Sequence, residues 1–151
     1  MIHLAKAIAS VCGIGYINNG RGAGTVASLV FCIVWFLIPS FLPGTRFAFL
    51  IIVLSAGVWS STMVERIWGK DNNKVVIDEV AGMMIVLLFI PAEIKYILTA
   101  LILFRFFDIV KPLGIKKLEL LPSGWGVMAD DIVAGIYSLI IMRIILLLNL
   151  F

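Results

Sequence analysis

Long runs of apolar residues alternate with short polar segments along the whole chain. Five such runs stand out, at residues 25–42, 47–64, 75–90, 94–107 and 132–150. Prolines help to separate them, because the first run closes at Pro39, the third stops at Pro91 and Pro112 follows the fourth. The runs are too long and too uniformly apolar for the alternating strands of a membrane barrel. The pattern therefore predicts an all-α protein.

The composition indicates the solvent in which these helices lie. Apolar residues make up 62% of the 151 residues, charged residues 14%, and the mean hydropathy is +1.14. Ordinary soluble domains are roughly half apolar and about a quarter charged. We therefore expect a polytopic helical membrane protein with about five membrane helices. No polar linker, repeat or cleavable signal peptide is evident, so residues 1–151 are expected to form a single membrane-embedded domain.

Five crossings would place every charged motif at the same end of the helices. The Gly-rich loop before the first run and the loops at 65–77 and 108–131 share this side, and the other two turns lie opposite. The first side holds eight basic residues, namely Arg21, Arg66, Lys70, Lys74, Arg105, Lys111, Lys116 and Lys117, whereas the opposite turns hold Arg46 and Lys95. Because basic residues are enriched in cytoplasmic loops, this side is expected to be cytoplasmic.

Five of the nine acidic residues lie at this end of three different helices. Asp78 and Glu79 open the third run, Asp108 ends the fourth, and Asp130 and Asp131 precede the fifth. Each set alone could cap or solvate a helix end. Five converging carboxylates would repel one another without a cation, and oxygen ligands without histidine or cysteine favour Mg²⁺. The sequence therefore predicts a metal site.

Arg105 and Lys111 bracket Asp108 at three-residue intervals on one face of the fourth helix. These residues could form only weak ion pairs within the helix. The interpretation that we favour is that the guanidinium and the ammonium group hold a phosphate while Asp108 holds the metal.

The stretch “NNGRGAGTVAS”, residues 18–28, opens the first long run with a Gly-rich loop. Free N–H groups at a helix N-terminus can bind a phosphate, and Gly24 and Thr25 lie where this would occur. A flexible turn capped by Thr25 is an equally good interpretation of this loop alone. The glycines of “LPSGWGVMADD”, residues 121–131, would likewise let the backbone approach a headgroup.

Several phosphatase chemistries lack the residues that they need. His3 is the only histidine, the sixth residue after Cys12 and after Cys32 is not arginine, and there is no D-x-D motif. Cys12 and Cys32 have no C-x-x-C spacing and lie in apolar sequence, so we expect buried free thiols. Direct attack by a metal-activated water remains.

Four motifs together resemble the phosphatidylglycerophosphatase A family. They are “GTVAS”, “DNNKVVIDEVAGMM”, “LFRFFDIVKP” and “GWGVMADDIVAG”, in this order from residue 24 to residue 135. The resemblance implies an all-helical, Mg²⁺-dependent enzyme of the bacterial inner membrane that hydrolyses phosphatidylglycerophosphate to phosphatidylglycerol and phosphate. By position, the family's functional residues match Thr25, Asp78, Glu79, Arg105, Asp108, Lys111, Asp130 and Asp131. Gly22–Ala23, Ala27, Asn72 and Gly114 depart from the family pattern, and they put the fine substrate specificity in question.

The residues and the resemblance together give a hypothesis for the site. The metal ligands would be Glu79, Asp108, Asp130 and Asp131, and the substrate would be held by Gly24, Thr25, Arg105 and Lys111. Asp78, Glu79, Arg105, Asp108, Lys111 and Asp131 would be the catalytic residues. A carboxylate could serve as the general base.

Two rival readings remain open. A small transporter or channel would use the acidic cluster as a cation site along its path, and a structural membrane subunit would use the charges only to solvate helix ends. The expected partners are the phospholipid substrate and the bilayer, without nucleic acid. A homodimer contact through the aromatic-rich second run is left open, and Arg143 has no assigned role.

Overall fold

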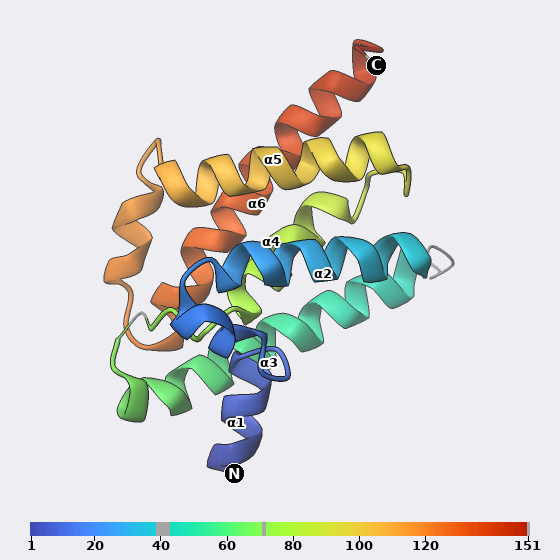
Figure 1. Ribbon diagram of the computed structural model, residues 1–151. Coiled ribbons are helices and arrows are strands. Elements are labelled where there is room, and N and C mark those ends of the chain that lie inside the picture. Colours follow the sequence, from blue (N-terminus) through green and yellow to red (C-terminus); the bar gives the residue numbers. More distant parts are fainter. Residues whose placement is uncertain (39–42, 71, 151) are drawn as a thin grey trace.

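The computed structural model describes residues 1–38, 43–70 and 72–150, and these residues form helices without a strand. The long helices are α2 (Ala23–Leu37), α3 (Pro43–Trp68), α4 (Ile77–Leu87), α5 (Ile94–Val110) and α6 (Gly124–Leu147). Short elements are α1 (Ile2–Ala9) and the 3₁₀ segments η1 (Ile14–Gly20) and η2 (Ile115–Leu120). Each predicted apolar run therefore overlaps one long helix, with residues 39–42 of the first run outside the described residues, and the all-α prediction is confirmed (Figure 1).

The number of helices that could cross a membrane is smaller than the number of apolar runs. Among the described residues, one helix is long and apolar enough to span a bilayer, at Gly44–Trp68 in α3. The 11 residues of α4 reach only about 16 Å at 1.5 Å per residue. The five membrane crossings predicted from the sequence are therefore not confirmed and stay a prediction.

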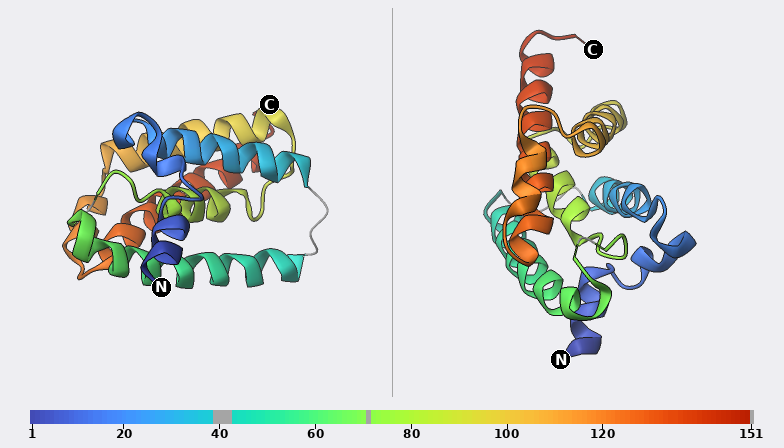
Figure 2. Two further views of the ribbon diagram at one scale, coloured as in Figure 1. Left: turned by 60° about the horizontal axis from the view of Figure 1, so that its bottom comes forward. Right: turned by 90° about the vertical axis from the view of Figure 1, so that its left-hand side faces the viewer.

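α4 lies at the centre of the bundle. It packs against α2, α3, α5 and α6, and every residue from Val80 to Leu87 is buried. The two further views show α4 surrounded by longer helices and α6 running across α5 (Figure 2). The apolar run that forms α4 is continuous because the helix has no face toward solvent.

Two glycines allow α4 and α6 to approach closely. A Cβ atom added at Gly135 would lie 2.6 Å from the carbonyl oxygen of Gly82, and one added at Gly82 would lie 2.8 Å from the carbonyl oxygen of Asp131. No side chain fits between the two backbones here. The contact brings the N-terminal half of α6 against α4, one turn beyond the acidic residues of both helices.

The ends of four helices that carry the charged motifs gather at one end of the bundle. α2, α4 and α6 begin there and α5 ends there, on the left in Figure 1. At the other end, Nη1 of Arg143 donates a hydrogen bond of 3.3 Å to the carbonyl oxygen of Phe89, just after α4. Arg143 thus has a backbone partner, whereas the sequence left its role unassigned.

The two cysteines are free thiols, as predicted, but they differ in exposure. Cys32 is buried on α2, whereas Cys12 is exposed. The prediction of two buried thiols is therefore wrong for Cys12. Its backbone has a φ of 54° in the turn after α1, and its neighbours Val11 and Ile14 pack against the core while Cys12 itself is exposed.

Candidate active site

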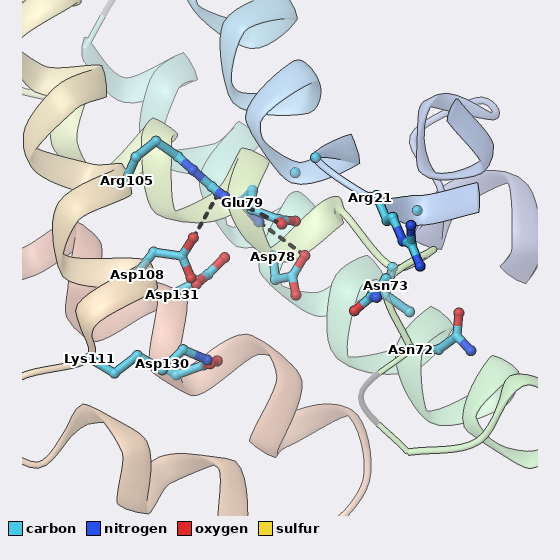
Figure 3. A pocket seen from close by; sticks show the side chains of 14 residues that line it. Arg21, Asn72, Asn73, Asp78, Glu79, Arg105, Asp108, Lys111, Asp130 and Asp131 are labelled. Atoms are coloured by element: carbon cyan, nitrogen blue, oxygen red, sulfur yellow. Dashed lines mark hydrogen bonds and ion pairs between the residues drawn. The ribbon is translucent and has the colours of Figure 1, made fainter. Parts of the chain in front are cut away.

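A polar cavity of about 310 Å³ lies where the charged helix ends meet (Figure 3). Its lining includes all five of the acidic residues singled out above, together with Arg105 and Lys111. The described residues that line it are Gly20, Arg21, Gly22, Gly24, Asn72, Asn73, Val75, Asp78, Glu79, Arg105, Asp108, Lys111, Asp130 and Asp131. The side chain of Thr25 is exposed and is not part of the lining, whereas its neighbour Gly24 is.

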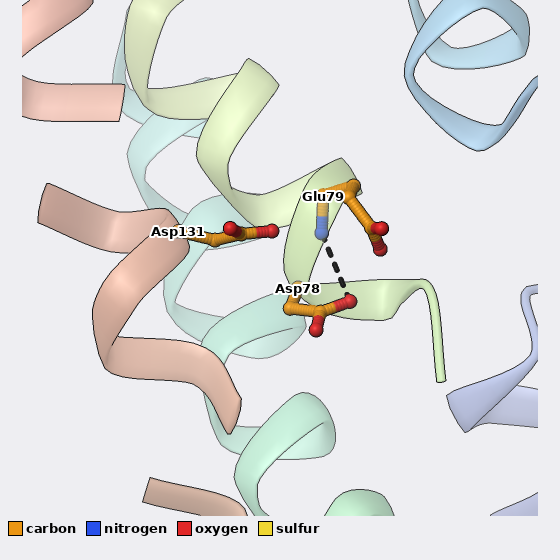
Figure 4. Close-up of side chains that lie close together, drawn as sticks. All are labelled: Asp78, Glu79 and Asp131. Carbon is orange, nitrogen blue, oxygen red and sulfur yellow. Dashed lines mark hydrogen bonds between the residues drawn. The ribbon is translucent and has the colours of Figure 1, made fainter. Parts of the chain in front are cut away.

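Three carboxylates form a compact group within this cavity. Asp78, Glu79 and Asp131 each offer an oxygen, and these oxygens lie within 4.8 Å of one another (Figure 4). The backbone N–H of Glu79 donates to Oδ1 of Asp78 at 3.1 Å, which fixes the first turn of α4. The compact group differs from the ligand set inferred from the sequence, because it contains Asp78 and lacks Asp108 and Asp130.

The donor set suits a hard cation. Carboxylate oxygens without a nitrogen or sulfur donor favour ions such as Mg²⁺, Mn²⁺ or Ca²⁺. In the described part of the chain, Oε2 of Glu79 and Oδ1 of Asp130 are buried without a hydrogen-bond partner. Such atoms lose solvation without compensation. A metal ion bound here would satisfy them, so the buried acidic group could hold one.

Arg105 connects the end of α5 with the start of α4. Its Nη1 atom lies 2.7 Å from Oδ2 of Asp108 and 3.8 Å from Oε1 of Glu79. Neither Nη1 nor Nε directs a hydrogen bond at a partner among the described residues, although both atoms are buried. The guanidinium therefore retains donors for an anion in the cavity.

Lys111 connects the end of α5 with α6 and with η2. It takes a left-handed conformation (φ 47°) as the C-cap of α5, and its Nζ donates to Oδ2 of Asp130 at 2.5 Å and to Oε1 of Glu119 at 2.7 Å. Burial lowers the pKa of this amine, but the hydrogen bonds to Asp130 and Glu119 outweigh burial and raise the pKa above its ordinary value. Lys111 therefore stays charged at neutral pH.

Burial and mutual repulsion make the charged form of the carboxyl groups of α6 less favourable. Burial raises the pKa of Asp131 well above its usual value, and the charges of Asp108 and Glu79 add to this effect. Burial also raises the pKa of Asp130, although the hydrogen bond from Lys111 partly offsets the increase. Negative charge is costly at this site, and a bound cation would reduce the cost.

Gly24 allows the start of α2 to contact Glu79. A Cβ atom at residue 24 would overlap Oε1 of Glu79 and would lie 2.6 Å from its carboxyl carbon. Only a glycine leaves the backbone of α2 this close to the carboxylate. The contact gives the Gly-rich loop a physical role in the site that its sequence alone did not establish.

Sequence reasoning missed four residues of the site region: Arg21, Asn72 and Asn73 line the cavity, and Glu119 binds Lys111. Arg21 and Asn73 are carried by loops far apart in the sequence. Glu119 lies in the 3₁₀ segment η2, eight residues after Lys111. No periodic pattern indicates any of these contacts, because each one depends on how two loops pack.

Comparison with known proteins independently indicates the family of this chain. A family model described as Phosphatidylglycerophosphatase A matches residues 7–146. A protein of Bacteroides thetaiotaomicron named “Putative phosphatidylinositol-3-phosphatase” is 40% identical over 129 residues, which cover 83% of this chain and 81% of the relative. No solved structure matches the chain.

Two relatives carry the name of the matched family. The phosphatidylglycerophosphatase A of Escherichia coli is 31% identical over 119 residues, covering 76% of this chain and 69% of the relative. That of Haemophilus influenzae is 47% identical over 73 residues, covering 47% of this chain and 45% of the relative. The chain therefore belongs to the phosphatidylglycerophosphatase A family and is a phosphatase enzyme.

Proposed function

We propose that the protein hydrolyses phosphatidylglycerophosphate to phosphatidylglycerol and inorganic phosphate, with Mg²⁺ as its cofactor. The observation that carries this proposal is the meeting of five carboxylates from three helices with Arg105 and Lys111 in one cavity. Carboxylates can hold a cation, and the two basic groups can hold the phosphate that the cation also contacts. The site thus offers negative groups for the metal ion and positive groups for the phosphomonoester.

The compact carboxylates Asp78, Glu79 and Asp131 would hold the metal, and Asp108 and Asp130 lie in the same cavity. When bound, Mg²⁺ would make a water molecule more acidic and neutralise charge on the phosphate. One carboxylate of the cluster would accept the proton that the attacking water loses. The water oxygen forms a bond to phosphorus, the bond from phosphorus to the glycerol oxygen breaks, and that oxygen takes up a proton.

Arg105 and Lys111 would act on the oxygens of the phosphate that do not take part in bond breaking. Charge on these oxygens is stabilised best by donors that are already in place, because no reorganisation is then needed during the reaction. The ion pairs to Asp108 and Asp130 hold both cations at the cavity wall. Gly24, at the start of α2, would let backbone N–H groups approach the headgroup, and Thr25 would position this turn.

Several observations support a membrane location with the site at the cytoplasmic face. Large apolar side chains are exposed along α2, α3, α5 and α6, including Ile33, Ile51, Ile102 and Ile144. Soluble monomers rarely expose so much apolar surface, and a bilayer would cover it. The excess of basic residues near the cavity favours a cytoplasmic orientation. We propose a single membrane-embedded domain in which the predicted apolar runs cross or enter the bilayer; whether it forms a homodimer stays an open prediction.

A transporter that uses the acidic cluster as a cation site fits the geometry less well. Such a protein would distribute charged side chains along a path through the membrane. Five of the described acids of this chain gather instead in one cavity at one end of the bundle, and Arg143 at the other end is bound to a backbone carbonyl. If the protein transported a cation, Arg105 and Lys111 would also have no role in binding it.

The name of the relative from Bacteroides thetaiotaomicron favours a second candidate substrate, phosphatidylinositol 3-phosphate. Both candidate substrates are phospholipids that end in a phosphomonoester, so the same cavity chemistry would serve either one. The two differ in the polyol, glycerol or inositol, that separates the phosphomonoester from the diacylglycerol. The test below therefore includes both lipids.

The experiment measures phosphate release in detergent micelles from each lipid, with Mg²⁺ and with a chelator. Purified wild type is compared with Asp131→Asn and with Glu93→Gln, whose exposed carboxylate pairs with Lys95 away from the cavity. We expect release that requires both the metal and Asp131, with Glu93→Gln close to wild type. Folded protein that releases no phosphate from either lipid with any divalent metal would overturn the proposal.

A further inference from the structure

Arg21 is a third cation of the cavity wall, and its environment differs from that of the other two. Arg105 is ion-paired with Asp108, and Lys111 is held by Asp130 and Glu119. The side chain of Arg21 is exposed and has no ion pair or hydrogen bond within residues 1–38, 43–70 and 72–150. Its guanidinium is therefore available to an anion, whereas the charges of Arg105 and Lys111 are already partly balanced.

The cavity wall that carries Arg21 is held in place by contacts between two loops. A Cβ atom at Gly20 would lie 2.8 Å from Cβ of Asn73 and 2.9 Å from its carbonyl oxygen, so the two loops touch at the backbone. The Asn72 side chain donates to the carbonyl oxygen of Trp68 at 2.8 Å and accepts the N–H of Lys74 at 3.1 Å. The Arg21 backbone is thus fixed against a loop that is itself held by side-chain hydrogen bonds.

Arg21 lies across the cavity from Arg105 and Lys111, with Asp78 and Glu79 between the two walls (Figure 3). Asn73 lies next to Arg21 on the same wall. A phosphate bound over the carboxylates would face Arg105 and Lys111, and the rest of the headgroup could extend toward Arg21. A cavity of about 310 Å³ is at the small end of ligand sites, which suits a polar headgroup without its acyl chains.

We propose that Arg21 and Asn73 form a second anion subsite that binds the phosphodiester joining the headgroup to the diacylglycerol. This inference rests on the proposed function, since it concerns the part of the same substrate that is not hydrolysed. A guanidinium can bind two phosphate oxygens at once, and the Asn73 amide adds a neutral donor beside it. The subsite selects lipids with two phosphates separated by a short polyol over lipids with a single phosphate.

The test compares two lipids with identical acyl chains in mixed micelles: phosphatidylglycerophosphate, which has both phosphates, and phosphatidic acid, which has only the phosphomonoester. The variant is Arg21→Gln. The matched control is Arg66→Gln, which removes an exposed cation at the end of α3 that does not line the cavity. Arg21→Lys keeps the charge and removes the fork geometry.

For Arg21→Gln we expect kcat/KM to fall about 10- to 100-fold on phosphatidylglycerophosphate, mainly through KM, from the loss of a charge-assisted contact. On phosphatidic acid the change should stay within about 2-fold, since that lipid has no phosphodiester for Arg21 to bind. Arg21→Lys should recover part of the loss, and Arg66→Gln should match wild type on both lipids. An equal loss on both lipids would mean that Arg21 acts only as a general surface charge. No loss on either lipid would mean that Arg21 does not bind the phosphodiester. Each of these results overturns the inference.

A binding measurement separates this inference from the proposed function. Dihexanoyl phosphatidylglycerol, a soluble lipid that contains only the phosphodiester, is titrated calorimetrically into wild type, Arg21→Gln and Arg66→Gln. We expect binding to weaken about 10-fold in Arg21→Gln alone. Unchanged binding in Arg21→Gln overturns the subsite even if wild type is a phosphatase, and selective weakening supports it even if the hydrolysed lipid is a different one.

Discussion

Gly82 on α4 and Gly135 on α6 meet backbone to backbone, and each lies one helical turn after an acidic residue of the candidate active site. Asp78 precedes Gly82 by four residues, and Asp131 precedes Gly135 by four. Because residues four apart share a helix face, the contact between the glycines sets the separation of the two carboxylates. The spacing of the acidic group is thus determined outside the cavity.

The first prediction concerns this contact. Gly135→Ala adds a Cβ atom 2.6 Å from the carbonyl oxygen of Gly82, so α4 and α6 must move apart. We expect a loss of about 1–3 kcal/mol in the free energy of unfolding and a fall in phosphate release of at least about 10-fold, since a displacement near 1 Å has large kinetic effects. Thermal unfolding and turnover are measured together, with Gly44→Ala as the control, because a Cβ at Gly44 meets no atom of the described residues within 4 Å.

The second prediction distinguishes Gly24 from its neighbour. Gly24→Ala places a Cβ atom against the carboxylate of Glu79, so we expect activity to be nearly abolished. Thr25→Ala removes an exposed side chain that does not line the cavity, and we expect activity within about 5-fold of wild type, typical of a surface position without a direct contact. Steady-state phosphate release by the two variants checks this. The opposite order would show that the Thr25 hydroxyl itself binds substrate.

The third prediction concerns the stability of the metal-free protein. The pKa values of Asp130 and Asp131 are raised in the folded state, so the folded protein keeps protons that the unfolded chain releases. The stability that these two groups contribute is therefore fully present below the ordinary carboxyl pKa of about 4 and is lost as the pH rises through the raised values. We expect the Tm in chelator to fall as the pH rises from 5 to 8, and Mg²⁺ to restore it most at pH 8. A Tm in chelator that does not fall with pH would contradict the prediction.

The fourth prediction concerns Glu119, which the sequence did not indicate. Glu119→Gln removes one of the two carboxylates that hold Lys111, while Asp130 remains bound at 2.5 Å. We expect phosphate release to fall about 3- to 10-fold, because the ammonium group is still charged but less firmly placed, and a hydrogen bond to a charged group contributes about 1.5–3 kcal/mol when lost completely. Asp130→Asn should cost much more. Equal effects of the two variants would show that Glu119 also contacts substrate.

The sequence was sufficient for the helices and for the convergence of the charged ends. Prolines and polar turns divide the apolar runs, and each run overlaps one long helix. Counting the crossings placed Asp78, Asp108 and Asp131 at one end, and all three line the cavity. These positions follow from the order and direction of the helices alone.

The contacts between loops could not be derived in the same way. Gly20 against Asn73 and Lys111 against Glu119 depend on left-handed turns and short 3₁₀ segments, at Gly20 (φ 86°) and Lys111 (φ 47°) for example. Hydropathy carries no information about such turns. The same limit applies to the membrane crossings, because an apolar run of fixed length is compatible with an exposed span or with a short buried helix such as α4.

The central place of α4 also bears on how the enzyme would respond to its lipid surroundings. α4 is enclosed by α2, α3, α5 and α6, and Phe89 after its last turn is bound by Arg143. Membranes that differ in thickness change the tilt of helices exposed to lipid. We expect the outer helices to absorb such mismatch, while the carboxylates at the start of α4 keep their positions, so that turnover depends little on acyl-chain length in the host bilayer.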